Sequence, residues 1–230
     1  VDEMNVKSIV LRNGKIITSR YIVSAADLKQ TYLNLIGKKY LRKDFIKTLN
    51  AMTPTLSTFI LYMGVDKSTK MPFPSFANIW IFSDFNLERA YKLAQKGGIK
   101  KLDYFLVHIS KDKNGITALA YSSFKDNKYW KLKKSEFTDI FISKIGRAIP
   151  GLLKNASIRG VATPQVLHAS TMNYKGSSFG WESTLSQFAI GGLSLTTPIN
   201  NLYTTGHWTT LTQGITGVAY LGRATAQLVL

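Results

Sequence analysis

The stretch that decides the fold lies near the C-terminal end, where residues 201–208 read NLYTTGHW and residues 213–224 read QGITGVAYLGRA. The first segment predicts a short buried strand that Gly206 ends. The second opens with glycines and predicts a helix from Gly214 to Leu228. Glycine lets a ligand approach the backbone closely, and the unpaired N–H groups at a helix start favour an anionic or electron-rich group. The pattern therefore predicts a strand–turn–helix unit with a ligand at the helix start.

The N-terminal residues predict a β-hairpin. Residues 5–23 carry two runs of β-branched and other apolar side chains on either side of Asn13-Gly14, a dipeptide typical of hairpin turns. The second run closes with small residues, Ser24-Ala25-Ala26, and then Asp27.

The middle of the chain alternates between helical and strand patterns. Residues 56–65 are apolar on both faces, which predicts a strand in the centre of a sheet. Residues 130–148 carry one apolar stripe and a lysine-rich face. We interpret this helix as a cover for the sheet rather than as a helix lying on a membrane. Further helices are expected at 28–36, 41–49 and 87–95, and further strands at 76–82, 104–109, 116–121 and 158–162.

Several of these stretches resemble one family, the FAD-dependent phytoene desaturase, carotenoid isomerase and retinol saturase group. Three consecutive motifs are typical of that group: L-Y-x-x-G-D/A, then G-x-G-[IV]-x-G-[VA], then S-G-R-x-A. The corresponding segments of this chain are, in the same order, LYTTGH, QGITGV and LGRA. Residues 5–27 are similar to the family pattern V-x-x-I-x-L-x-N-G-x-x-I-x-A-D-x-V-V-S-A-A-D, with Ser19-Arg20 in place of Ala-Asp. Residues 162–180 are similar to A-T-P-x-T followed by Y-x-G-N-x-x-G-S-x-Y-G.

The resemblance implies FAD as the cofactor. The family commonly has Asp, which holds the ribityl chain of FAD, where this chain has His207. Tyr174, Phe179 and Trp181 are the candidate substrate-binding residues, with core residues at a domain interface as the alternative. The candidate cofactor-binding residues are Ala25, Ala26, Gly206, His207, Gln213, Gly214, Ile215, Thr216, Gly217 and Val218.

The resemblance also implies an α+β fold, in which a mixed-sheet substrate domain covered by helices is flanked by pieces of a Rossmann-like FAD-binding domain. We expect an FAD-domain hairpin at 1–27, the substrate-binding domain at 28–195, and the C-terminal FAD-binding strand and helix at 196–230. The G-x-G-x-x-G motif that holds the pyrophosphate in this family is absent from the sequence. Since the chain also begins at Val1, we expect a C-terminal fragment that is inactive without the N-terminal dinucleotide-binding half of the same protein.

The resemblance implies redox chemistry or isomerisation at carbon–carbon bonds of a polyene or isoprenoid, as in carotenoid biosynthesis. Two alternatives stay open: a fragment of an amine-oxidase-type flavoenzyme, and a stand-alone basic binding module without a cofactor. Gly176 to Gly180 matches the hydrolase motif G-x-S-x-G, but a polar, turn-like segment precedes it instead of a buried strand. No catalytic residue is assigned. We expect no metal site, because the chain lacks cysteine and its three histidines lie far apart in sequence.

The formal net charge of +17 arises mainly from clustered lysines. They form either an ordinary solvated surface or a face that contacts an anionic membrane. Nucleic acid is a weaker candidate partner, because aromatic residues do not interleave with the lysines and no recognition motif is present. The sequence has no run of 18 apolar residues, so we expect a cytoplasmic protein, with peripheral membrane contact as a further option.

Overall fold

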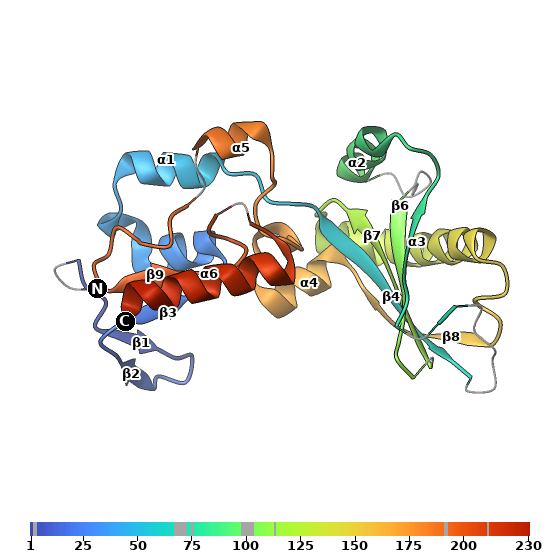
Figure 1. Cartoon of the computed structure of the whole chain (residues 1–230), viewed down its shortest axis with the longest axis horizontal. Coiled ribbons are helices and arrows are strands. Elements are labelled where there is room, and N and C mark those ends of the chain that lie inside the picture. The colour runs from blue at the N-terminus through green and yellow to red at the C-terminus, as the bar shows by residue number, and fades with distance from the viewer. Residues whose placement is uncertain are drawn as a thin grey trace. The chain divides into compact units, whose positions relative to one another are not determined.

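The computed structural model describes residues 1, 4–66, 73–74, 76–97, 104–112, 114–190, 193–210 and 212–230. They form two compact units, which Figure 1 shows in one view. Unit 1 combines Val1–Thr55 with Met172–Leu230, and unit 2 is Leu56–Thr171. These unit boundaries differ from the expected domain boundaries, which lay between residues 27 and 28 and between residues 195 and 196. Residues on both sides of each expected boundary belong to unit 1, because Leu28, Leu49, Trp181 and Leu193 share one hydrophobic core with Trp208.

Unit 2 contains a five-stranded sheet in the order β5-β6-β7-β4-β8, in which β4 pairs on both sides as its two apolar faces predicted. Every pairing is antiparallel. The expectation of a mixed sheet in the substrate domain was therefore wrong. The connection from β6 to β7 is short, which is typical of neighbouring strands that run in opposite directions. The strands are β4 (Ser57–Val65), β5 (Asn78–Phe82), β6 (Tyr104–Ile109), β7 (Gly115–Ser122) and β8 (Ala156–Ala162).

Helix α3 (Asn127–Ala148) covers one face of this sheet, as the apolar stripe predicted. Asp126 caps it by accepting a hydrogen bond from the Tyr129 N–H at 2.7 Å. Phe59 of β4 stacks on the Phe137 ring with centroids 4.5 Å apart. Two further helices belong to the unit: α2 (Leu87–Lys96), which Asn86 caps, and α4 (Pro164–Thr171).

Unit 1 begins with the expected hairpin, β1 (Ser8–Val10) and β2 (Ile16–Thr18), closed through Gly14 at φ 83°. The second run of the hairpin then divides. Its last part forms a separate strand, β3 (Ile22–Ser24), which pairs in parallel with β9 (Leu202–Thr204). Unit 1 thus joins segments from both ends of the chain.

The helices of unit 1 surround a core that includes the fully buried rings of Tyr32, Trp181 and Trp208. The first expected helix is a π-helix, and the C-terminal helix begins at Gly214 as predicted. The helical segments are η1 (Gln30–Gly37), η2 (Lys38–Tyr40), α1 (Lys43–Ala51), η4 (Tyr174–Gly176), α5 (Leu185–Ile190) and α6 (Gly214–Val229).

The core of unit 2 depends on aromatic side chains that α3 inserts against the sheet. Phe141 is fully buried and contacts Phe59 and Phe105, with ring centroids 6.4 and 5.3 Å apart. We expect Phe141→Ala to lower the free energy of unfolding by about 3–5 kcal/mol because it leaves a cavity. Leu132→Ala, on an exposed position of the same helix, should change it by no more than about 0.5 kcal/mol. Urea titration followed by circular dichroism measures both, and equal losses would contradict this packing.

Candidate functional site

The ends of the parallel strands β3 and β9 bring together two segments that the sequence predicted as cofactor contacts. The Thr205 N–H donates to the Ser24 carbonyl at 3.0 Å. A Cβ on Gly206 would lie 3.8 Å from the Ala25 carbonyl oxygen, and Ala25 and Ala26 are exposed. In open sheets with parallel strands, ligands bind outside the carboxyl ends of the strands. The predicted residues at 25–26 and at 206 therefore lie side by side where such a ligand would bind.

The start of α6 is open. Gly214 has φ 78° and no atom within 4 Å of its Cβ position, and Ile215 is 87% exposed. Gln213 precedes the helix without capping it, since its side-chain amide donates instead to the Trp181 carbonyl at 2.5 Å. Thr216 is exposed and Val218 is half-buried. The first N–H groups of the helix are thus not occupied by a side-chain cap.

Gly217 has a packing role within the same motif. A Cβ at this position would lie 2.6 Å from the Thr212 side chain. The absent side chain lets the start of the helix pack closely against the loop before it.

A buried carboxylate, Asp27, lies directly after Ala26. Its two oxygens accept hydrogen bonds from the backbone N–H groups of Tyr174, at 2.6 Å, and Gln30, at 3.0 Å. Burial raises the pKa of Asp27, and these hydrogen bonds oppose that shift. Sequence reasoning recorded this residue only as the end of the S-A-A-D pattern and did not propose it for the site.

Lys29 is also buried, and its ammonium group lies over aromatic rings. The Nζ atom is 4.1 Å from the centroid of Tyr174 and 5.7 Å from that of Trp181. Burial lowers the pKa of Lys29, while the charge of Asp27 opposes the shift. The sequence gave no signal for this contact, because Lys29 is distant along the chain from Tyr174 and Trp181.

The three candidate substrate-binding residues differ in exposure. Trp181 is fully buried, and its indole N–H donates to the Trp208 carbonyl at 2.7 Å. The rings of these tryptophans meet edge to face, with centroids 4.7 Å apart. Tyr174 is half-buried, whereas Phe179 is 38% exposed. Trp181 therefore lies in the core of unit 1 rather than at a domain interface, and Phe179 presents its ring at the surface.

His207 is held by close backbone packing. A Cβ on Gly180, where φ is 79°, would lie 2.0 Å from the His207 carbonyl oxygen. The imidazole is half-buried, and its Nε2 atom is buried without a hydrogen-bond partner among the described residues. The Thr205 hydroxyl oxygen is also buried and has no hydrogen-bond partner among these residues. Burial lowers the pKa of His207, and the charge of Asp27 opposes this shift.

These features fit a dinucleotide cofactor with one change from the family pattern. Unpartnered polar atoms at residues 205 and 207, exposed alanines and an uncapped helix start are suited to a ligand that carries hydrogen-bonding and anionic groups. A neutral imidazole can donate or accept one hydrogen bond at Nε2, whereas a carboxylate only accepts.

The hydrolase-like sequence at residues 176–180 has no nucleophile elbow. The 3-10 turn η4 precedes it instead of a strand, and α5 does not begin until Leu185. The serine at the nucleophile position of the motif is Ser178, which lies in a bend between η4 and α5 rather than between a strand and a helix. The segment before the motif is therefore turn-like, as the sequence indicated.

Unit 2 carries an aromatic surface that sequence reasoning missed. On the face of the sheet opposite α3, Tyr104 of β6 stacks with Trp80 and Phe82 of β5, with ring centroids 5.2 and 5.0 Å apart. Tyr121 of β7 adjoins Tyr104 at 5.5 Å, and burial raises its pKa to about 12. Trp80 and Phe82 are each 44% exposed. In the sequence, the alternation of side chains in residues 78–82 could have indicated that Trp80 and Phe82 share one face of a strand. Their contact with Tyr104 and Tyr121 also depends on the register of three strands, which the sequence does not show.

Two searches among the described residues bear on other classes of site. No group of three or more histidine, aspartate or glutamate side chains there is arranged to hold a metal ion. No helix in the same part of the chain is both long and apolar enough to cross a bilayer.

Comparisons with known proteins give the fold a context. No protein-family model matches the chain. Phytoene desaturase (lycopene-forming) from Paracoccus sp. strain N81106 is 23% identical over 233 residues, covering 96% of this chain and 46% of that protein. The structure of an oxidoreductase from Methanosarcina mazei aligns with 99% of this chain and 47% of its own, at 10% identity and a TM-score of 0.56. A Pyrococcus furiosus protein aligns at 12% identity and a TM-score of 0.52, covering 99% of this chain and 45% of its own.

The chain therefore has an α+β fold shared with a known oxidoreductase structure, and it spans about half the length of the proteins it matches.

The contact between Gly180 and His207 predicts a large difference between two glycine substitutions. Gly180 and Gly214 share φ values of 79° and 78°, but only Gly180 has backbone atoms at its Cβ position. Gly214→Ala should cost about 1 kcal/mol of unfolding free energy through its backbone conformation alone. Gly180→Ala should cost about 3 kcal/mol because His207 must also move. Chemical denaturation of the two variants measures the difference, and equal losses would disprove the close contact.

The lowered pKa of His207 predicts a dependence of stability on pH. The unfolded state binds a proton near the ordinary pKa of 6.5, while the folded state resists it, so stability should fall as pH drops below that value. His207→Gln should reduce this loss between about pH 7.5 and about pH 5. The raised pKa of Asp27 makes stability change with pH in the opposite direction. Asp27 is present in both proteins, so its contribution cancels when their stabilities are compared. Urea midpoints across this range test the prediction, which an unchanged slope in the variant would refute.

Proposed function

We propose that this chain is the C-terminal part of a flavin-dependent oxidoreductase. The observation that carries the proposal is the parallel pairing of β3 with β9, which puts Ala25 beside Gly206 at the strand ends. The uncapped start of α6 follows in the same glycine-rich segment. Similarity to phytoene desaturase over 96% of the chain supports FAD as the cofactor.

Each part of this segment has a role in the proposed site. The N–H groups at the start of α6, near Gly214 and Ile215, would stabilise negative charge on the pyrimidine edge of the flavin. Ala25 and Ala26 would let the dinucleotide approach the backbone, and His207 would offer one hydrogen bond. Bound FAD would supply the hydride chemistry itself.

The proposed substrate is an apolar polyene or isoprenoid. The name of the Paracoccus relative, a lycopene-forming phytoene desaturase, supports it. Phe179, one of the candidate substrate-binding residues, presents its ring at the surface of the unit that also contains the glycine-rich segment.

We also propose that the chain works with a separate dinucleotide-binding half. A two-stranded parallel pair such as β3–β9 is too small to be stable alone, and parallel sheets are usually covered on both faces. The chain also lacks the G-x-G-x-x-G motif. Without that half we expect weak or absent FAD binding and no activity. Several apolar side chains of unit 1 are exposed and suited to such a partner, namely Val10, Ile16, Ile215 and Tyr220.

The absorption spectrum of the intact protein tests this proposal. It should show bound flavin, and a polyene rather than an amine should reduce that flavin under anaerobic conditions. Ile215→Asp should abolish flavin binding by placing a carboxylate at the helix start, yet leave the stability of the 230-residue chain unchanged because Ile215 is exposed.

Leu35→Asp is the matched control. It makes the same chemical change at a 74% exposed position in η1, outside the glycine motif, and should retain flavin. Intact protein without flavin, or full flavin content in Ile215→Asp, would contradict the proposal.

A further inference from the structure

Helix α5 carries two large apolar side chains that point away from the core of unit 1. Leu185 is 89% exposed and Phe188 is 57% exposed, and residues three apart on a helix share one face. Gln187, between them, is buried, and its side-chain amide binds the Thr53 backbone. It accepts from the N–H at 2.8 Å and donates to the carbonyl at 3.2 Å. The buried glutamine holds the helix in an orientation that leaves both apolar side chains outside.

Helix α5 adjoins the C-terminal end of α1, because Thr53 lies two residues after α1 ends (Figure 1). Helix α1 buries Leu49 and exposes Lys43 and Lys47, which lie four residues apart and share one face. Exposed apolar side chains on one helix are thus followed by exposed basic side chains on its neighbour.

The chain at the start of α1 is strongly basic. Residues 38–47 contain five basic side chains and a single acidic one, and all six are exposed. The acidic residue, Asp44, lies 3.4 Å from Arg42 and offsets only part of this charge. The basic residues are Lys38, Lys39, Arg42, Lys43 and Lys47. Clusters of this size favour an anionic lipid surface.

We propose that α5 and the basic side of α1, here called the α1–α5 surface, bind an anionic lipid bilayer. Leu185 and Phe188 would enter the boundary between headgroups and acyl chains, while Lys43 and Lys47 would contact the phosphates. Lysines alone fit an ordinary solvated surface equally well. The exposed apolar pair beside them favours a membrane, because interfacial binding combines apolar burial with electrostatic attraction.

The α1–α5 surface is independent of the flavin proposal. It includes none of the residues proposed to contact the cofactor, and none of the apolar side chains proposed to contact the dinucleotide-binding half. The membrane contact can therefore be tested on the intact protein whether or not that protein holds flavin.

Sedimentation of the intact protein with lipid vesicles tests the apolar part of the surface. The protein should bind phosphatidylglycerol vesicles at least about tenfold more tightly than phosphatidylcholine vesicles, and added salt should weaken that binding. Leu185→Ser with Phe188→Ser should weaken binding to phosphatidylglycerol by about tenfold or more, because both side chains lose their burial in lipid. Leu132→Ser with Phe85→Ser makes the same two changes at exposed positions of unit 2 and should alter binding by less than about twofold.

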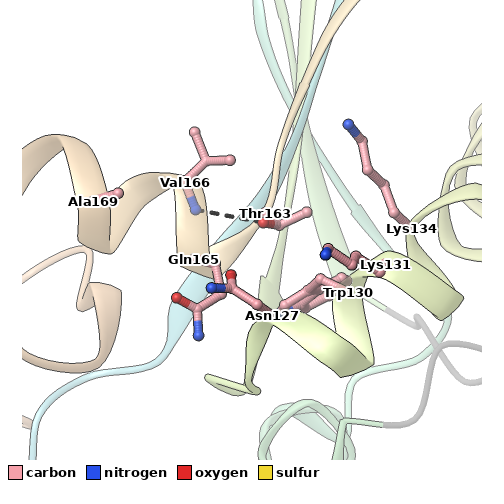
Figure 2. Close-up of a pocket in the computed structure, with 8 residues that line it drawn as sticks. All are labelled: Asn127, Trp130, Lys131, Lys134, Thr163, Gln165, Val166 and Ala169. Atoms are coloured by element: carbon pink, nitrogen blue, oxygen red, sulfur yellow. Dashed lines mark hydrogen bonds between the residues drawn. The ribbon is translucent and has the colours of Figure 1, made fainter.

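A second pair of variants tests the charge. Lys43→Gln with Lys47→Gln should weaken binding to phosphatidylglycerol by about tenfold or more. Lys131→Gln with Lys134→Gln removes the same charge from α3 of unit 2, where both lysines border a cavity of about 300 Å³ (Figure 2). This control should weaken binding by less than about threefold, because its lysines lie outside the proposed contact.

The proposal is overturned if the intact protein does not bind phosphatidylglycerol vesicles, or if either unit 2 control loses as much binding as its unit 1 counterpart. Loss of flavin in the Leu185/Phe188 variant would also overturn it, because that result would assign the surface to the dinucleotide-binding half. If the intact protein lacks flavin but binds these vesicles through Leu185 and Phe188, the flavin proposal alone fails.

Discussion

The parallel pairing of β3 with β9 is the constraint on which unit 1 depends. It aligns Ile22 with Leu202 and Ser24 with Thr204, and so joins the two ends of the chain. The Asn201 side chain reinforces the junction, since it exchanges hydrogen bonds with the backbone of Val6 at 2.7 and 2.8 Å. Closing so long a loop costs entropy, which this small strand pair recovers only together with the core around it.

That core mixes apolar packing with buried polar groups. Trp181 and Trp208 fill its centre, while Asp27 and Lys29 are buried beside them. Asp27 holds the backbone of Tyr174, so a residue next to the strand end also positions the segment that carries Phe179. Buried polar networks of this kind fix one arrangement when satisfied and are costly when they are not. The unpartnered atoms at Thr205 and His207 lie at the strand end, where a ligand would supply what the chain lacks.

Local patterns were sufficient for the elements that organise each unit. Asn13-Gly14 gave the hairpin, the apolar faces of residues 56–65 gave a central strand, and Gly214 gave the start of α6. Such patterns do not predict which strands pair when they are distant along the chain. The sequence did not indicate that β3 leaves the hairpin to join β9, and the substrate-domain sheet was expected to be mixed but is antiparallel. The unit boundaries differed for the same reason, since residues 28–55 and 172–195 join unit 1 through side-chain packing.

The candidate site shows the same division. The motif residues from Ala25 to Val218 could be named from the sequence, and the structure places Ala25 beside Gly206. The roles of Asp27 and Lys29 required contacts with Tyr174, nearly 150 residues away, which no local pattern encodes. Trp181 was named as a candidate from the family pattern, yet its ring packs inside the core. Sequence identifies where chemistry-bearing residues cluster along the chain, whereas burial decides which of them reach a ligand.

The measurement that tests the central claim most directly is the coding sequence upstream of Val1. The account predicts a strand followed by G-x-G-x-x-G and a helix, with an acidic residue after the second strand, because these would complete the dinucleotide site proposed at β3, β9 and α6. An initiator methionine directly before Val1, with no such unit upstream, would contradict the claim that this chain is one half of a single flavoenzyme.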